Sequence, residues 1–197
     1  RGVGAGVCRT QGNFYPDYYG RFGVESHITW TWTMLGRPFF GQRVFYVLQA
    51  LRWARNLPDL AGRKNALVGV GSGALWALFA SALDGMVDKT LAHAPLFAFG
   101  SLLDAHDHSW HVSSLPPGML AWGDVQHVAA LISPRELTLL HPVDAARSPV
   151  SRLALSRAYR DARSVFNAQG TPSRLTLVPA EHCGRCERPR YADWLRD

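Results

Sequence analysis

Residues 65–80 read Asn65-Ala66-Leu67-Val68-Gly69-Val70-Gly71-Ser72-Gly73-Ala74-Leu75-Trp76-Ala77-Leu78-Phe79-Ala80, and they say more about the architecture than any other segment. An apolar run of β-type residues at 66–70 meets a glycine-rich turn. A run rich in alanine and leucine follows directly and favours a helix. A strand that passes through a tight turn straight into a helix is typical of parallel α/β sheets. The segment therefore predicts the class of the fold.

The turn also follows the pattern of a nucleophile elbow, G-x-S-x-G, in which a serine lies at the sharp bend between strand and helix. Here glycine (Gly71) holds the nucleophile position, and Ser72 comes one residue late. Ser72 is then either a displaced nucleophile or a serine that pairs with backbone N–H groups at the start of the helix. We expect Gly71 to have either a positive φ or a tight approach to a neighbouring strand. The N–H groups around Ser72 and Gly73 are candidate oxyanion donors.

The rest of the chain alternates helices with strands, which predicts one α/β domain over residues 1–197. Apolar spacing predicts helices at 44–54, 73–83, 124–131 (capped by Asp124), 151–169 and from 191 onward. Short apolar runs predict strands at 66–70, 90–94, 136–143 and 174–179. Residues 1–40 are expected to form an ordered loop region and residues 100–123 to be loop-like, with 104–111 as a cap loop over the active-site face.

Two polar residues follow predicted strands, at the edge where parallel sheets collect functional groups. Asp144 comes directly after the strand at 136–143, and His182 comes shortly after the strand at 174–179. The chain order is elbow, acid, histidine, which is the order of α/β-hydrolases and differs from the other serine-triad lineages. Each residue alone could equally be a turn aspartate or a surface-loop histidine. Together they predict that Asp144 hydrogen-bonds His182 and orients it as a base.

Several phrases carry a wider resemblance: the elbow, Arg1-Gly2-Val3-Gly4, Gly41-Gln42-Arg43-Val44, Ala130-Leu131-Ile132-Ser133-Pro134-Arg135, Pro142-Val143-Asp144 and Glu181-His182. Together they resemble the α/β-hydrolase superfamily, in particular its bacterial group of acetyl xylan esterase-like and dienelactone-hydrolase-like proteins. The resemblance implies an α/β-hydrolase-type, mostly parallel sheet flanked by helices. It also implies that this chain is the C-terminal portion of the domain, without the N-terminal strands and without the loop that supplies a second oxyanion donor.

The resemblance further implies a carboxylic ester hydrolase that transfers an acyl group to serine, with Ser72, Asp144 and His182 as catalytic residues. Its substrate would be a small-molecule or carbohydrate ester, and neither a cofactor nor a metal is expected. Because glycine holds the nucleophile position, the alternative is a non-catalytic relative with a degenerate elbow.

Three other motifs are candidates for different ligands. Gly69, Gly71 and Ala74 fit the dinucleotide fingerprint G-x-G-x-x-G/A, but the next predicted strand, 90–94, ends without the acidic residue that would hold a ribose. Residues 104–111 are rich in aspartate and histidine, which are metal-ligand types, without an obvious partner cluster. Cys183 and Cys186 form a lone C-x-x-C that fits a local disulfide or two free thiols better than zinc.

The formal net charge is +6, and its excess comes from arginines scattered along the whole chain rather than from a basic run. Such a distribution disfavours nucleic-acid binding. No stretch approaches the roughly 18 apolar residues of a membrane helix. The sequence leaves the oligomeric state open, and a periplasmic, an extracellular or a cytoplasmic location is compatible with it.

Overall fold

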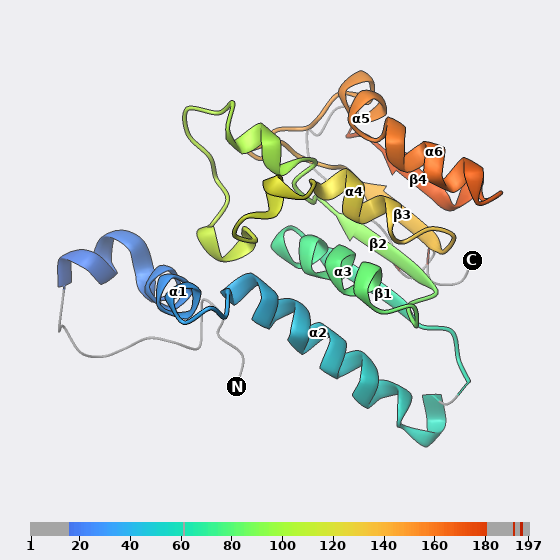
Figure 1. Cartoon of the computed structure of the whole chain (residues 1–197), viewed down its shortest axis with the longest axis horizontal. Coiled ribbons are helices and arrows are strands. Elements are labelled where there is room, and N and C mark those ends of the chain that lie inside the picture. Colours follow the sequence, from blue (N-terminus) through green and yellow to red (C-terminus); the bar gives the residue numbers. More distant parts are fainter. Residues whose placement is uncertain (1–15, 61, 181–190, 192–193, 195–197) are drawn as a thin grey trace.

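The computed structural model describes residues 16–60, 62–180, 191 and 194 (Figure 1). Arg1-Gly2-Val3-Gly4, Glu181, His182, Cys183 and Cys186 lie outside the described residues. The helices are α1 (Pro16–Met34), α2 (Phe39–Arg55), α3 (Ser72–Leu83), α4 (Val125–Ala130), α5 (Arg152–Ala158) and α6 (Arg160–Ala168). The strands are β1 (Ala66–Val70), β2 (Lys89–His93), β3 (Glu136–Leu140) and β4 (Leu175–Val178). Short 3₁₀ turns, η2 (Phe99–Leu102), η3 (Val112–Ser114) and η4 (Met119–Ala121), lie between β2 and α4.

The four strands form one parallel sheet in the order β1-β2-β3-β4, which is also their order along the chain. β1 is an edge strand of this sheet in the part of the chain that the structure describes. α3 packs on β1 and β2, with α2 and α4 beside it and α6 against α4 (Figure 1). The predicted α/β-hydrolase-type architecture, a mostly parallel sheet flanked by helices, is confirmed.

The two faces of the sheet are covered by different parts of the chain. Ser81 of α3 hydrogen-bonds Thr90 at 2.7 Å between the two hydroxyl oxygens, so the even-numbered residues of β2 face the helical layer. Because side chains alternate along a strand, Lys89 faces the opposite side. There its ammonium donates to the backbone oxygen of Trp194 at 2.7 Å. The Trp194 indole donates to Thr138 of β3 at 3.3 Å, so Trp194 packs on the second face.

β1, β2 and β3 end in the same way. The residue after each strand has a left-handed backbone, with φ of 58° at Gly71, 51° at Ala94 and 49° at His141. The N–H of each of these residues donates to the neighbouring strand, at 2.8 Å to His93 O, 2.8 Å to Leu140 O and 2.7 Å to Val178 O respectively. The sheet therefore ends in a row of tight turns, and two of them hold residues for which this conformation costs about 1–2 kcal/mol.

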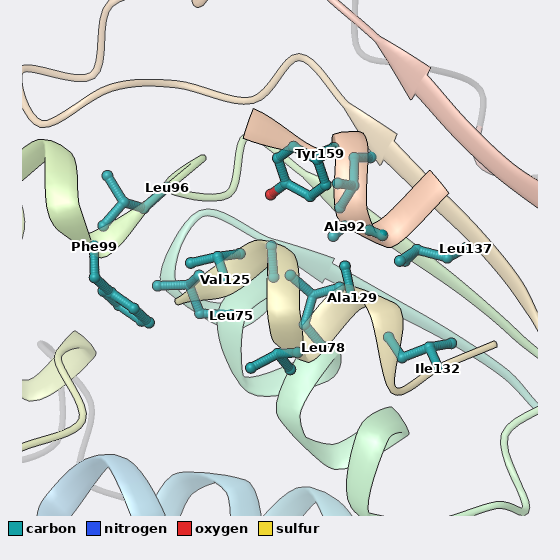
Figure 2. Close-up of a cluster of buried hydrophobic side chains, with 14 of the residues drawn as sticks. Leu75, Leu78, Ala92, Leu96, Phe99, Val125, Ala129, Ile132, Leu137 and Tyr159 are labelled. Carbon is teal, nitrogen blue, oxygen red and sulfur yellow. The ribbon is translucent and has the colours of Figure 1, made fainter. Parts of the chain in front are cut away.

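The core lies between the sheet and its helical layer. Figure 2 shows it as a cluster in which leucines of α3 meet apolar residues of α4 and of the sheet, with Tyr159 above them. Tyr159 is fully buried, and its hydroxyl donates to the carbonyl of Phe97 at 3.0 Å. Burial raises the pKa of Tyr159 far above its ordinary value, so the phenol stays protonated.

Tyr159 also explains why one predicted helix is two. The sequence predicts a single helix over 151–169, but the structure breaks it at Tyr159 (φ −96°, ψ 18°) into α5 and α6. The break falls at the residue whose phenol is held by the Phe97 carbonyl. The predicted apolar stripe holds nevertheless, because Leu155, Ala162 and Phe166 are buried.

The prediction of loops over 1–40 is wrong where the structure describes it, because α1 is helical. α1 bends at Gly23, which has φ 76° and ψ 162°. Its sequence has weak helical periodicity, and the helix is stabilised by packing against α2 and η3. The predicted strand over 136–143 is also too long, since β3 ends at Leu140 where His141 turns into the left-handed region. Asp124 caps α4 as predicted.

No helix in the described ranges has the length and apolar character needed to cross a lipid bilayer.

Arg135 ties α3 to the sheet and gives a testable prediction. Its guanidinium donates to the carbonyls of Ser81 (2.6 Å), Asp84 (3.0 Å) and Val87 (3.1 Å), which lie in and after the last turn of α3. We expect Arg135→Ala to lower the free energy of unfolding by about 2 kcal/mol, because charged hydrogen bonds to a helix C-terminus are lost. The measurement is urea denaturation followed by circular dichroism.

The matched control for Arg135→Ala is Arg174→Ala. Arg174 is exposed, and its guanidinium makes a single hydrogen bond to the Pro134 carbonyl at 2.9 Å. Arg174→Ala should lower the free energy of unfolding by less than about 1 kcal/mol. Equal losses for the two variants would contradict the role assigned to Arg135.

Candidate functional site

The elbow has the backbone geometry that its sequence predicts. β1 ends at Val70, Gly71 turns with φ 58° and ψ −121°, and α3 begins at Ser72. Of the two alternatives predicted for Gly71, the positive φ is confirmed. A Cβ built on Gly71 would have 3.9 Å to its nearest neighbour, Nη1 of Arg147, so the position has room for a side chain. The elbow is therefore sterically open at residue 71, the position to which the G-x-S-x-G pattern assigns the nucleophile.

Ser72 lies in the first turn of α3, and its hydroxyl contacts the loop above it. The Ser114 hydroxyl donates to Ser72 Oγ at 2.6 Å. No hydrogen bond joins the Ser72 side chain to a backbone N–H among the described residues, so the helix-capping alternative is not what the structure adopts. Because Ser72 Oγ accepts from Ser114, its own hydroxyl hydrogen is left to be donated to another group.

A polar network behind Ser114 fixes this loop to α1. His111 Nε2 lies 2.9 Å from the hydroxyl oxygen of Ser26, and its Nδ1 lies 2.8 Å from that of Ser113. Ser113 donates to Glu25 at 2.8 Å, and Glu25 pairs with Arg43 of α2 at 3.6 Å. Segment 111–114 is therefore hydrogen-bonded to α1, and Glu25 of α1 pairs in turn with Arg43 of α2. The same segment contacts the elbow through Ser114 and Ser72.

Asp144 organises the loop after β3. Its Oδ1 accepts from the N–H groups of Ala146 (2.9 Å) and Ser148 (2.8 Å), and Oδ2 has no hydrogen-bond partner among the described residues. This is the turn-forming role that an aspartate can have on its own. It leaves one carboxylate oxygen for a further partner. His182 lies outside the described residues, so the predicted Asp144–His182 hydrogen bond stays a prediction.

Trp110 and Arg147 join the loop above the elbow to the Asp144 loop. The Trp110 indole donates to the Asp144 carbonyl at 3.0 Å, and Ser109 N donates to Ala145 O at 2.9 Å. The Arg147 guanidinium lies over the Trp110 ring at 4.5 Å from its centroid, and its Nε donates to Ser109 O at 3.2 Å. These contacts hold the loop between β2 and α4 against the loop that follows β3.

Two histidines lie at the same edge of the sheet. His93 ends β2 and His141 follows β3, with ring centroids 5.6 Å apart. Nδ1 of His93 lies 2.6 Å from the Tyr191 hydroxyl. Burial lowers the pKa of His93, and the neighbouring His141 lowers it further, so the neutral imidazole is favoured. Neither histidine contacts Ser72 or Asp144 by hydrogen bond.

The segment 104–111 and the dinucleotide fingerprint gain no supporting partners among the residues that the structure describes. Within the described ranges no group of three or more His, Cys, Asp or Glu side chains could share a metal ion. His106 and Asp107 point into solvent, and His111 belongs to the network with Ser26. Dinucleotides bind where the order of parallel strands reverses, and the described sheet runs in sequential order without a reversal.

Sequence reasoning missed the residues that surround the elbow from above. Ser114, Trp110 and Arg147 are far from Ser72 in the chain, and no motif marks them. The only available signal is that Arg147 lies three residues after Asp144, in the loop that follows an acid strand. Their convergence on the elbow is a product of the tertiary structure.

Comparisons with known proteins bear on the fold. No family model matches this sequence, and no curated protein matches it either. Among solved structures, the chain is similar to one from Bacteroides fragilis described as a "putative acetyl xylan esterase", with a TM-score of 0.63 and 13% sequence identity. The match covers 79% of this chain and 40% of that chain, so this chain spans about two fifths of its length. The sequential parallel sheet, the elbow at Gly71 and this likeness together assign an α/β-hydrolase-like fold to the chain.

Proposed function

We propose that the protein is a carboxylic ester hydrolase of the acetyl-esterase type, acting by acyl transfer to Ser72. The observation that carries the proposal is the elbow at Gly71, with φ 58° and ψ −121° between a parallel strand and a helix, and with Asp144 following β3 at the same edge of the sheet. The similar solved structure from Bacteroides fragilis is described as a putative acetyl xylan esterase, which supports an acetyl ester as the substrate proposed here.

In the proposed reaction, Ser72 Oγ attacks the carbonyl carbon of the ester while His182 Nε2 takes the hydroxyl proton. The bond between the carbonyl carbon and the alcohol oxygen then breaks, and the departing alkoxide receives that proton from His182. Water, deprotonated by His182, then attacks the acyl-serine. The bond between the carbonyl carbon and Ser72 Oγ breaks, His182 returns the proton to Ser72 Oγ, and the acid is released. Asp144 would hold the histidine tautomer through Oδ2, the oxygen not used by Ala146 and Ser148.

The negative oxygen of the tetrahedral intermediate needs hydrogen-bond donors. The N–H groups of Ser72 and Gly73 lie in the first turn of α3, where no intrahelical acceptor exists for them. They are the donors that this chain would contribute. The Ser114 hydroxyl holds Ser72 Oγ at 2.6 Å and so restricts the rotamer from which attack would occur.

The test of Ser72 is labelling of the full chain with a fluorophosphonate, followed by peptide mapping. We expect one adduct, on Ser72, that is lost in Ser72→Ala and in His182→Ala. The control is Ser164→Ala on α6, where the hydroxyl only bonds the Arg160 carbonyl at 3.2 Å and labelling should persist. A folded protein that carries no adduct, or an adduct on another serine, would refute Ser72 as nucleophile.

A second candidate is a non-catalytic relative that keeps the fold for binding. The specific observation in its favour is Gly71, which leaves the tip of the elbow without a side chain. The two candidates differ in what happens when a serine is restored there.

Gly71→Ser tests the acid–base pair independently of Ser72. We expect kcat/KM for para-nitrophenyl acetate to rise about 100-fold, because a serine at residue 71 would take the nucleophile position of the G-x-S-x-G pattern, which the proposed Asp144–His182 pair would serve. Gly71→Ala is the matched control, since it introduces the same Cβ at φ 58° and the same backbone strain without a hydroxyl. No gain in a folded Gly71→Ser protein relative to Gly71→Ala would favour the non-catalytic relative.

A further inference from the structure

Arg147 is held in place over the elbow. Its guanidinium stacks on Trp110, which is 2% exposed, and its Nε is fixed by the Ser109 carbonyl at 3.2 Å. Nη1 lies 3.9 Å from the position of a Cβ on Gly71. The cation therefore lies beside the tip of the elbow, one residue before the proposed nucleophile Ser72. Stacking on Trp110 and the hydrogen bond to Ser109 restrict this exposed side chain before any ligand binds.

No carboxylate neutralises this arginine within the described ranges. The ion pairs found there include Arg43 with Glu25 and His106 with Asp107, and none involves Arg147. The carboxylate in the same loop, Asp144, uses its Oδ1 for the N–H groups of Ala146 and Ser148. With Nε bonded to Ser109, the donors on the two terminal nitrogens remain for a ligand.

We propose that Arg147 is a binding residue for a carboxylate group on the ligand of this site. The planar guanidinium pairs with a carboxylate through parallel N–H···O bonds, and stacking on Trp110 fixes the plane in which that pair forms. The formal net charge of +6 adds a field that attracts anions. This inference rests on the proposed ester hydrolysis and narrows it to esters that carry a negative charge close to the scissile bond.

The carboxylate can belong to the acyl side or to the alcohol side of such an ester. Para-nitrophenyl hemisuccinate carries it on the acyl group, and meta-acetoxybenzoate carries it on the alcohol. Para-nitrophenyl acetate and phenyl acetate are their neutral counterparts. We expect Arg147→Gln to lower the ratio of kcat/KM for the anionic ester to that for its neutral counterpart by about tenfold, on the side that faces Arg147.

Arg157→Gln is the matched control for Arg147→Gln, because it removes one positive charge from an exposed position on α5. It should leave both ratios at the wild-type value. A ratio that is unchanged in Arg147→Gln for both pairs of esters would overturn the inference, and so would an equal fall in Arg157→Gln.

A binding measurement separates this inference from the proposed function. Benzoate is titrated into the full chain at fixed ionic strength and followed by tryptophan fluorescence and by calorimetry, with benzamide as the neutral comparison. We expect benzoate to bind the wild type and Arg157→Gln about tenfold more tightly than Arg147→Gln, and benzamide to show no such difference. Benzoate binding that depends on Arg147 in a protein that hydrolyses no ester would refute the esterase while keeping the carboxylate site. The absence of any benzoate binding, or binding indifferent to Arg147, would refute the carboxylate site itself.

Discussion

Gly69→Ala is expected to lower the free energy of unfolding by about 4 kcal/mol, because among the glycines that the structure describes it is the one where an added Cβ meets the closest backbone atoms. Gly69 is a buried residue of β1 beneath the first turn of α3. An added Cβ would lie 2.7 Å from the Cα of Ala74 and would overlap the carbonyl oxygen of Gly73. These are backbone atoms, so no side chain can move aside. Relief requires α3 to shift away from the sheet.

The measurement for Gly69→Ala is chemical denaturation monitored by circular dichroism and tryptophan fluorescence, with Gly73→Ala as the matched control. Gly73 belongs to the same glycine-rich turn, but a Cβ there meets nothing within 4 Å. Since alanine is the better helix former, Gly73→Ala should leave stability unchanged or raise it by up to about 1 kcal/mol. If both variants were as stable as the wild type, the close approach of β1 and α3 would be wrong.

Asp124→Ala is expected to lower the free energy of unfolding by about 3 kcal/mol, because one buried carboxylate accepts hydrogen bonds from three backbone N–H groups. Its Oδ1 accepts from Phe99 N at 2.5 Å and from Val125 N at 2.6 Å, and its Oδ2 accepts from Gly100 N at 2.9 Å. The residue is 8% exposed, so water cannot readily replace the carboxylate. Its loss would leave the start of α4 and the turn η2 without an acceptor.

Asp124→Asn refines this test, because asparagine keeps one acceptor oxygen at the position of Oδ1. The amide nitrogen then faces the N–H of Gly100, so about half of the loss should remain. The effect is read from urea unfolding, and hydrogen exchange of the Phe99 and Gly100 amides reports where protection is lost. Unchanged exchange at both amides in Asp124→Ala would refute the network around this carboxylate.

Much of the fold is readable from local patterns. The apolar run at 66–70 and the glycine-rich turn predict β1 and the start of α3 within one residue. They do so because a short apolar run followed by glycines is compatible with few local conformations other than a buried strand and a tight turn. The cap of α4 is equally local, since Asp124 pairs with the N–H of the next residue. The helix broken at Tyr159 and the helical α1 escaped prediction because distant partners decide them: the Phe97 carbonyl in one case and η3 with α2 in the other.

The candidate site likewise has features that follow from local sequence and features that depend on distant contacts. The sequence by itself determined the α/β class, the left-handed turn at Gly71 and the position of Asp144 after a strand, because each follows from residues that are neighbours in the chain. Only the tertiary structure decided that Ser114 holds the Ser72 hydroxyl and that Arg147, stacked on Trp110, lies beside the elbow. These contacts join loops that follow different strands. Parallel strands bring such loops to one edge of the sheet, and packing across that edge, which no local pattern encodes, selects which side chains meet.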